Sequence, residues 1–217
     1  MLGKLSPSRP SPPLRRPLHS FENIKLSDDV LNKFSLIKKI HPEAILAGGA
    51  LRDSVFGKPI KDIDIFIEFP FSNFAELLNM KIERSAASID YTLFDTDTHI
   101  KGIYDVFTRD DTPPIQIIEL ESLDIQALLS GFDWGFCQIG TKDCKSFIVT
   151  DHFMNDYNNN TATCVLESSD TRLKHSLKRG KKLFKKYPDK KFMTPLSSEL
   201  FNILTMENSI GENYILA

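Results

Sequence analysis

The chain has 217 residues, of which 41% are hydrophobic and 26% are charged, and its formal net charge is −2. This composition is typical of a soluble globular protein with one good-sized domain, or with a core domain and a smaller appendage. The near-neutral charge predicts no general attraction to nucleic acid, so such a partner would have to meet a local basic patch. No apolar run is long enough to span a bilayer, and we expect no membrane partner.

The first 20 residues differ from the rest of the chain. They are rich in proline and contain Lys and Arg but no Asp or Glu. We predict a disordered, extended tail over residues 1–20. A targeting signal is the alternative, and it is disfavoured because the prolines would interrupt an amphipathic helix.

After the tail, hydrophobic residues alternate between helical and strand spacing. The first helix has Ser27 as its N-cap. Helices are predicted at 26–40, 50–56, 73–79, 122–130 and 173–187. Strands are predicted at 43–47, 62–68, 115–120, 134–139, 146–149 and 162–166, with two or three more between 80 and 108 that include 100–107. This order favours an α/β or α+β fold built on a mixed sheet.

Two adjacent glycines, Gly48 and Gly49, lie between a predicted strand and a predicted helix. Glycines at such a place let backbone N–H groups approach phosphate oxygens, and the helix N-terminus adds partial positive charge. Arg52 lies one turn into the helix, from where its guanidinium could reach a phosphate. Because tight turns also use glycine, this pattern needs a second feature to indicate function.

The second feature is a pair of carboxylates on the next predicted strand. Asp62 and Asp64 are two residues apart, so a strand places both on one face. Two close carboxylates repel each other unless a cation compensates, and magnesium prefers carboxylate and phosphate oxygens. An exposed strand face that carries acids is the alternative. With the glycines just before them, these residues favour a nucleoside triphosphate (NTP) bound with Mg²⁺ or Mn²⁺.

The order of these motifs resembles the head domain of the polymerase-β-type nucleotidyltransferases. The matching residues are Gly48-Gly49-x-x-Arg52-Asp53, then Gly57, and then Asp62-x-Asp64. Within that superfamily the pattern is most similar to tRNA CCA-adding enzymes and bacterial poly(A) polymerases, and the size is closest to phage-type small nucleotidyltransferases. The resemblance implies a mixed-sheet nucleotidyltransferase head over residues 21–160. It also implies catalytic and metal-binding roles for Asp62 and Asp64, and nucleotide-binding roles for Gly48, Gly49, Arg52 and Asp53.

Two further positions match the family only in part. Asp133 occupies the place of an aspartate in a family segment that contacts the ribose, but both family arginines are missing; a helix-capping role is the alternative. For the third metal carboxylate, Gln116 stands at the expected position. We therefore consider Glu119 as the third ligand, although a strand would point it to the opposite face. The alternative is that Asp62 and Asp64 hold the metal with fewer protein ligands.

Residues 161–217 are predicted to form a small, mainly helical, basic part. A charge run is usually a solvated helix face, but here one sign dominates, which favours contact with the phosphate backbone of RNA. The resemblance suggests Arg172 and Arg179, with Asp170, for contact with the incoming nucleotide. The residues expected to bind RNA are Lys178, Lys181, Lys182 and Lys185. The family's long helical neck, body and tail have no counterpart here, so we do not expect a full CCA-adding enzyme.

These features predict a cytoplasmic enzyme that transfers a nucleoside monophosphate to an acceptor hydroxyl and releases pyrophosphate. The acceptor would be an RNA, possibly the 3′ end of a tRNA. The odd number of cysteines, none at metal-ligand spacing, agrees with reduced thiols in that compartment. One alternative is a nucleotide- or RNA-binding protein that has lost catalysis, and another is a transferase that modifies a protein or a small molecule.

Overall fold

The computed structural model describes residues 17–22, 24–68, 81–84, 100–107, 113–167, 172–195 and 214–216. The strands within this part are β1 (Leu18–Phe21), β2 (Ile45–Ala47), β3 (Ile63–Glu68), β4 (Lys81–Arg84), β5 (Ile100–Phe107), β6 (Ile115–Leu120), β7 (Ile139–Thr141), β8 (Phe147–Thr150), β9 (Thr161–Thr163), β10 (Lys191–Thr194) and β11 (Tyr214–Leu216). The helices are α1 (Asp28–Ile40), α2 (Gly49–Val55), α5 (Ile125–Ser130), α6 (Asp151–Asn159) and α7 (Leu173–Lys186), with a 3₁₀ helix η1 (Gly135–Cys137).

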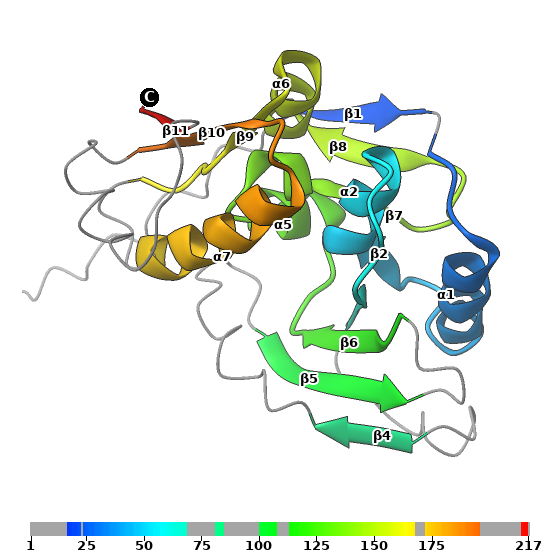
Figure 1. Cartoon of the computed structure of the whole chain (residues 1–217). Helices are drawn as coiled ribbons and strands as arrows, with labels where there is room; N and C mark the ends of the chain where they lie inside the picture. The colour runs from blue at the N-terminus through cyan, green and yellow to red at the C-terminus, as the bar shows by residue number, and fades with distance from the viewer. Residues whose placement is uncertain are drawn as a thin grey trace, which may run out of the picture.

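A mixed sheet organises the fold, as the sequence predicts (Figure 1). Its described strands follow the order β1-β8-β7-β2-β3-β6-β5-β4. The strands β3 and β6 run parallel, and every other neighbouring pair in this sheet is antiparallel. The β3–β6 register places Asp64 opposite Gln116. This pairing brings the predicted carboxylate strand and the predicted third-ligand strand side by side.

The alternation of side chains along β3 divides the buried core into two clusters. Ile63, Ile65 and Ile67 pack with residues of α1 and α2 on one face of the sheet. Phe66 points to the other face, where it packs in a second cluster with residues of α5, η1 and α7. Asp62 and Asp64 share the face of Phe66, so they point toward the side of the sheet that α7 covers.

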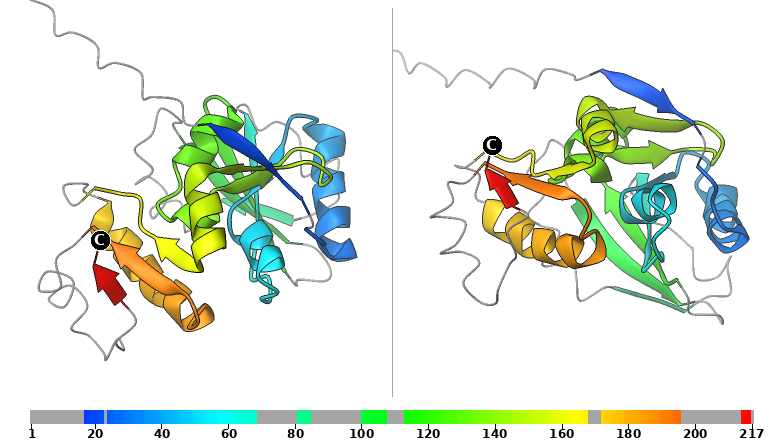
Figure 2. Two further views of the ribbon diagram at one scale, coloured as in Figure 1. Left: turned by 90° about the horizontal axis from the view of Figure 1, so that it is seen from above. Right: turned by 45° about the horizontal axis from the view of Figure 1, so that its top comes forward.

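The C-terminal part contains a small sheet beside helix α7. Its strands follow the order β11-β10-β9 and are parallel (Figure 2). Trp134 joins this part to the main sheet: its indole Nε1 donates to the carbonyl oxygen of Ser176 on α7 at 3.1 Å. A Cβ atom on Gly180 would lie 2.4 Å from the Trp134 ring. Glycine is therefore what allows α7 to approach this closely.

Several predictions are corrected by the structure. Segment 134–139 is not a strand, because Trp134 makes a single bridge with Cys164 and the next residues turn into η1 before β7 begins. Leu18–Phe21 pair with β8, so the predicted tail does not extend to Leu18. Residues 1–16, the predicted helix 73–79 and Asp170 lie outside the described residues. No helix in the described part of the chain combines the length and apolar character needed to cross a membrane.

Candidate active site

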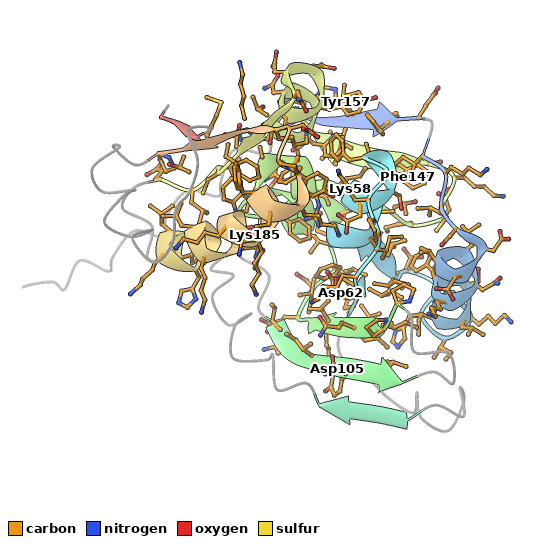
Figure 3. The ribbon with its side chains drawn as sticks, viewed as in Figure 1. Lys58, Asp62, Asp105, Phe147, Tyr157 and Lys185 are labelled. Atoms are coloured by element: carbon orange, nitrogen blue, oxygen red, sulfur yellow. The ribbon has the colours of Figure 1, made fainter. Side chains whose placement is uncertain are left out.

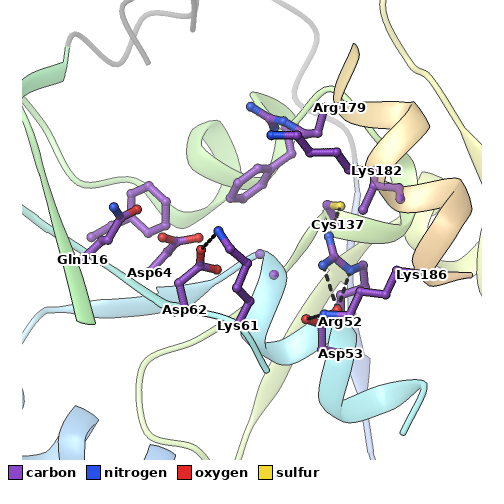
Figure 4. Close-up of a pocket in the computed structure, with 15 residues that line it drawn as sticks. Arg52, Asp53, Lys61, Asp62, Asp64, Gln116, Cys137, Arg179, Lys182 and Lys186 are labelled. Carbon is purple, nitrogen blue, oxygen red and sulfur yellow. Dashed lines mark hydrogen bonds and ion pairs between the residues drawn. The ribbon is translucent and has the colours of Figure 1, made fainter. Parts of the chain in front are cut away.

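A cleft of about 470 Å³ lies between the glycine turn, the carboxylate strand β3 and helix α7 (Figure 4). It collects most of the residues that the sequence analysis selected for a nucleotide and a metal. Those that line it are Gly48, Gly49, Arg52, Asp53, Asp62, Asp64 and Arg179. Lys182, which was predicted for RNA, lines it as well. Side chains that the motif did not indicate also line it, among them Lys61, Phe132, Cys137 and Lys186.

The turn at Gly48 needs glycine for two reasons. Its φ is +79°, in the region that residues with a side chain rarely adopt, and an added Cβ would lie 3.2 Å from the Phe132 ring. The Gly48 N–H donates to the carbonyl oxygen of Ile139, and the Gly48 carbonyl accepts from Arg52 N at the start of α2. Gly49 lies close to the carboxylates. A Cβ atom added there would be 4.0 Å from Asp62 Oδ1.

The two carboxylates have different environments. Asp62 is partly exposed and its Oδ2 accepts a hydrogen bond from Lys61 Nζ at 3.0 Å. Asp64 Oδ1 is buried and has no hydrogen-bond partner among the described residues. Burial, and then the negative charge of Asp62, raise the pKa of Asp64 to about 7. A buried carboxylate oxygen without a donor, next to a second carboxylate, is suited to a divalent cation.

The third-ligand position differs from the prediction. Glu119 pairs with Ile67 and lies on the opposite face from Asp64, where it is buried and accepts a hydrogen bond from Tyr104. The described residues contain no group of three His, Cys, Asp or Glu side chains that could hold a metal ion. The structure therefore does not bring Glu119 to the two aspartates, because alternation along β6 turns it away.

Gln116 lines the cleft in the place where the third carboxylate was expected. Its Nε2 donates to Asp105 Oδ1 on β5 at 2.8 Å (Figure 3 labels Asp105). Because a carboxylate only accepts hydrogen bonds, this contact fixes which side of the amide is the nitrogen. The side-chain oxygen of Gln116 is on the side of Asp64 (Figure 4).

Arg52 and Asp53 form a buried cluster that joins α2 to the end of α7. Arg52 Nε and Nη2 donate to Asp53 Oδ1 at 2.9 and 2.7 Å, and Nη1 donates to Cys137 Sγ at 3.1 Å. Asp53 also accepts hydrogen bonds from the Tyr187 hydroxyl and from Lys186 Nζ. The motif pair at 52–53 thus has structural partners that the sequence did not indicate, because they lie 85 or more residues further along the chain.

Helix α7 has three faces of different character. Leu173, Leu177, Gly180 and Leu183 are buried. One basic face borders the cleft with Arg179, Lys182 and Lys186. At 100° per residue, a second basic face comprises Lys174, Lys178, Lys181 and Lys185, which we call the outer lysine row.

The other residues predicted for the nucleotide differ in their position relative to the cleft. Asp133 is buried, and its Oδ1 accepts a hydrogen bond from Arg179 Nη1 at 2.9 Å, so these two are brought together. Arg172 is the N-cap residue of α7 and is not among the residues that line the cleft. Of the four lysines predicted for RNA, Lys182 borders the cleft and the other three belong to the outer lysine row.

Comparisons with known proteins agree with the architecture. No protein-family model and no curated protein matches the chain. Among solved structures, the CCA-adding enzyme of Thermotoga maritima in complex with tRNA matches with a TM-score of 0.57 and 19% identity, over 84% of this chain and 43% of that one. A CCA-adding enzyme in complex with CTP matches with a TM-score of 0.57 and 17% identity, over 84% and 44% of the two chains. The fold is that of a nucleotidyltransferase head.

A tRNA nucleotidyltransferase in complex with a primer tRNA and an incoming ATP analog also matches this head, with a TM-score of 0.51 and 14% identity, over 80% of this chain and 50% of that one. The chain spans half or less of the length of the three proteins. At these identities the likeness concerns the fold. The chemistry of the head therefore has to be argued from its own cleft.

Proposed function

We propose that the protein transfers a nucleoside monophosphate from an NTP to an acceptor hydroxyl and releases pyrophosphate. The observation that carries this proposal is the buried oxygen of Asp64, which has no donor among the described residues and lies beside Asp62 and the glycine turn. Facing these acids across the same cleft are the cations of α7. Acids that can hold a metal and cations that can hold phosphates are the two requirements of phosphoryl transfer.

Asp62 and Asp64 would hold Mg²⁺ or Mn²⁺. When bound, this ion would neutralise charge on the phosphates and so favour in-line attack by the acceptor. One of the two carboxylates would also accept the proton of the attacking hydroxyl. The amide nitrogen of Gln116 donates to Asp105, which leaves the side-chain oxygen of Gln116 as a neutral oxygen beside them.

The triphosphate would lie between the glycine turn and the cleft face of α7. The N–H of Gly48 is already bonded to Ile139, so the N–H of Gly49 is the donor of this pair that remains for a phosphate oxygen. Lys182 and Lys186 would contribute positive charge from the opposite wall. Arg52, whose guanidinium is held by Asp53 and Cys137, would contribute mainly by keeping that wall in place.

An RNA acceptor, possibly the 3′ end of a tRNA, is supported by the lysines of α7 and by the tRNA complexes of two structural neighbours. A second candidate is a nucleotide-binding protein that has lost catalysis. That candidate is favoured by Gln116, a neutral residue where a third carboxylate was expected.

The test is transfer of label from each of the four NTPs, labelled at the α-phosphate, to total RNA in the presence of Mg²⁺ or Mn²⁺. We expect labelled RNA and an equal amount of pyrophosphate, and we expect both to be lost in the Asp62→Asn/Asp64→Asn variant. Tight NTP binding without transfer to any acceptor would favour the second candidate. Activity that survives the double substitution would show that these carboxylates do not carry the reaction.

A further inference from the structure

The outer lysine row is a straight line of like charges. Its members, Lys174, Lys178, Lys181 and Lys185, follow one another at intervals of four, three and four residues. At 1.5 Å per residue the row extends for about 16 Å along α7. Lys174, Lys178 and Lys185 are exposed, and Figure 3 labels Lys185 on this helix.

Three of the four charges of this row are not compensated within the described part of the protein. No ion pair or hydrogen bond with another described residue engages Lys174, Lys178 or Lys185, whereas Lys181 makes a further contact. On the cleft face, by contrast, Arg179 pairs with Asp133 and Lys186 with Asp53. The two basic faces of α7 therefore differ in how their charge is balanced.

The arrangement of charges in helix α7 also lowers the stability of the helix. Its first turn contains no acidic residue and its N-cap makes no side-chain hydrogen bond. A lysine near a helix N-terminus opposes the helix dipole, and like charges at i and i+4 repel each other. An anionic partner laid along the row would remove both penalties.

The surroundings of the row favour a polyanion over a lipid surface. A helix that lies in a membrane interface buries exposed apolar or aromatic side chains beside its basic face. The apolar face of α7 is already buried against the rest of the protein. Within the described residues, the one large hydrophobic side chain that is exposed is Tyr157, which lies on α6.

We infer that the outer lysine row binds the phosphate backbone of an RNA acceptor strand, while the cleft face of the same helix serves the incoming nucleotide. This inference rests on the proposed function, and it assigns Lys182 to the nucleotide and not to the RNA. Because both faces belong to one rigid helix, an RNA bound along the row lies within reach of the cleft.

The test compares two triple variants of the full chain. One is Lys174→Gln/Lys178→Gln/Lys185→Gln, which removes three charges of the row and keeps good helix formers. The matched control, Lys25→Gln/Lys39→Gln/Lys145→Gln, removes three exposed lysines that lie outside α7. Binding is measured by fluorescence anisotropy with a short labelled single-stranded RNA, and in parallel with a morpholino of the same sequence, whose backbone is neutral.

We expect the row variant to bind the RNA at least tenfold more weakly than wild type, and the control variant to bind it like wild type. Each phosphate contact on a single strand contributes about 0.7 to the slope of log affinity against log salt, so the slope should fall by about 2 in the row variant. The morpholino should bind weakly to all three proteins. Equal RNA affinity of the row variant and the control, or equal binding of RNA and morpholino, would overturn the inference.

Two readouts separate this inference from the proposed function. The row variant should still be stabilised against heat by Mg·ATP, which shows that its fold and cleft are intact. The Asp62→Asn/Asp64→Asn variant should bind RNA like wild type although it transfers nothing. RNA binding that depends on the row, in a wild-type protein without transferase activity, would contradict the proposed function and leave the binding surface standing.

Discussion

Asp64 is the residue at which the local environment most changes the chemistry. Its Oδ1 is buried without a hydrogen-bond partner in the described part of the chain, and a second carboxylate lies two residues away. Its ionised form is disfavoured by both features. The folded protein therefore holds this proton up to a pH at which an ordinary aspartate has long lost it.

A pH dependence of stability follows for the metal-free protein. The folded pKa of Asp64 is about 7, whereas an unfolded aspartate titrates near about 3.9. The unfolded state loses the proton first, so the free energy of unfolding should decrease as the pH rises from about 4 to about 7, by roughly 1.4 kcal/mol per unit of pKa difference. Urea unfolding in a chelator, at pH 5 and pH 8, measures this.

The Asp64→Asn variant provides the comparison, because it keeps the size of the side chain and removes the titrating group. Its stability should decrease less than that of wild type between the two pH values. If both proteins respond equally to pH, the raised pKa of Asp64 is wrong.

The hydroxyl of Tyr187 has a structural role that can be tested separately from the packing of its ring. Its hydroxyl donates to Asp53 and accepts from Arg52 Nε at 3.1 Å, while its ring packs on Phe56 and Phe136. Tyr187→Phe keeps the ring and removes these hydrogen bonds, so we expect a loss of about 1–2 kcal/mol in the free energy of unfolding. Tyr157→Phe is the matched control, since Tyr157 is 44% exposed. A loss no greater than that of the control would contradict the structural role.

Helix α7 depends on one close contact for its position. Replacing Gly180 by Ala would normally favour a helix by about 1 kcal/mol. Here the new Cβ would lie 2.4 Å from Trp134, and overpacking costs about 1–3 kcal/mol. We expect Gly180→Ala to be destabilised and its tryptophan fluorescence altered, whereas Lys174→Ala on the exposed row should be at least as stable as wild type and should leave the fluorescence unchanged. A Gly180→Ala variant as stable as wild type would show that α7 can shift without cost.

The elements that the sequence predicted well are those whose pattern is local. The first helix has its N-cap at Ser27, and the isoleucines of β3 alternate with Asp62 and Asp64 as a strand requires. The closeness of the glycine turn to these carboxylates also follows from their short separation along the chain. Such patterns need no knowledge of distant residues.

The elements that were missed depend on distant partners or have weak local patterns. Strand β1 forms because it pairs with β8, far along the chain. Helix α6 is rich in Asn and Asp, which are poor helix formers; its Asp156 accepts hydrogen bonds from Thr161 and Thr163 on β9. The partners of Arg52 at Cys137 and Tyr187 are likewise visible only after folding.

For the molecule as a whole, the cleft is bounded on one side by the sheet and on the other by α7. A ligand that binds both walls should therefore stabilise the entire fold. We expect Mg·ATP to raise the melting temperature of wild type by several degrees and to have much less effect on Asp62→Asn/Asp64→Asn. Differential scanning fluorimetry with ATP alone, Mg²⁺ alone and both together measures the effect. An equal shift in the two proteins would place the nucleotide elsewhere.

The segregation of charge in α7 has a kinetic consequence. Seven of the chain's 27 Lys and Arg residues, but none of its 29 Asp and Glu residues, lie in this one helix. Because the net charge of the whole chain is only −2, the seven positive charges of α7 are balanced by negative charge elsewhere, and α7 is a concentrated positive region. Its field would turn the molecule during a diffusional encounter with a polyanion, so that α7 arrives first and the encounter is faster than chance orientation allows. That acceleration is lost when salt shortens the range of the field to about 10 Å or less.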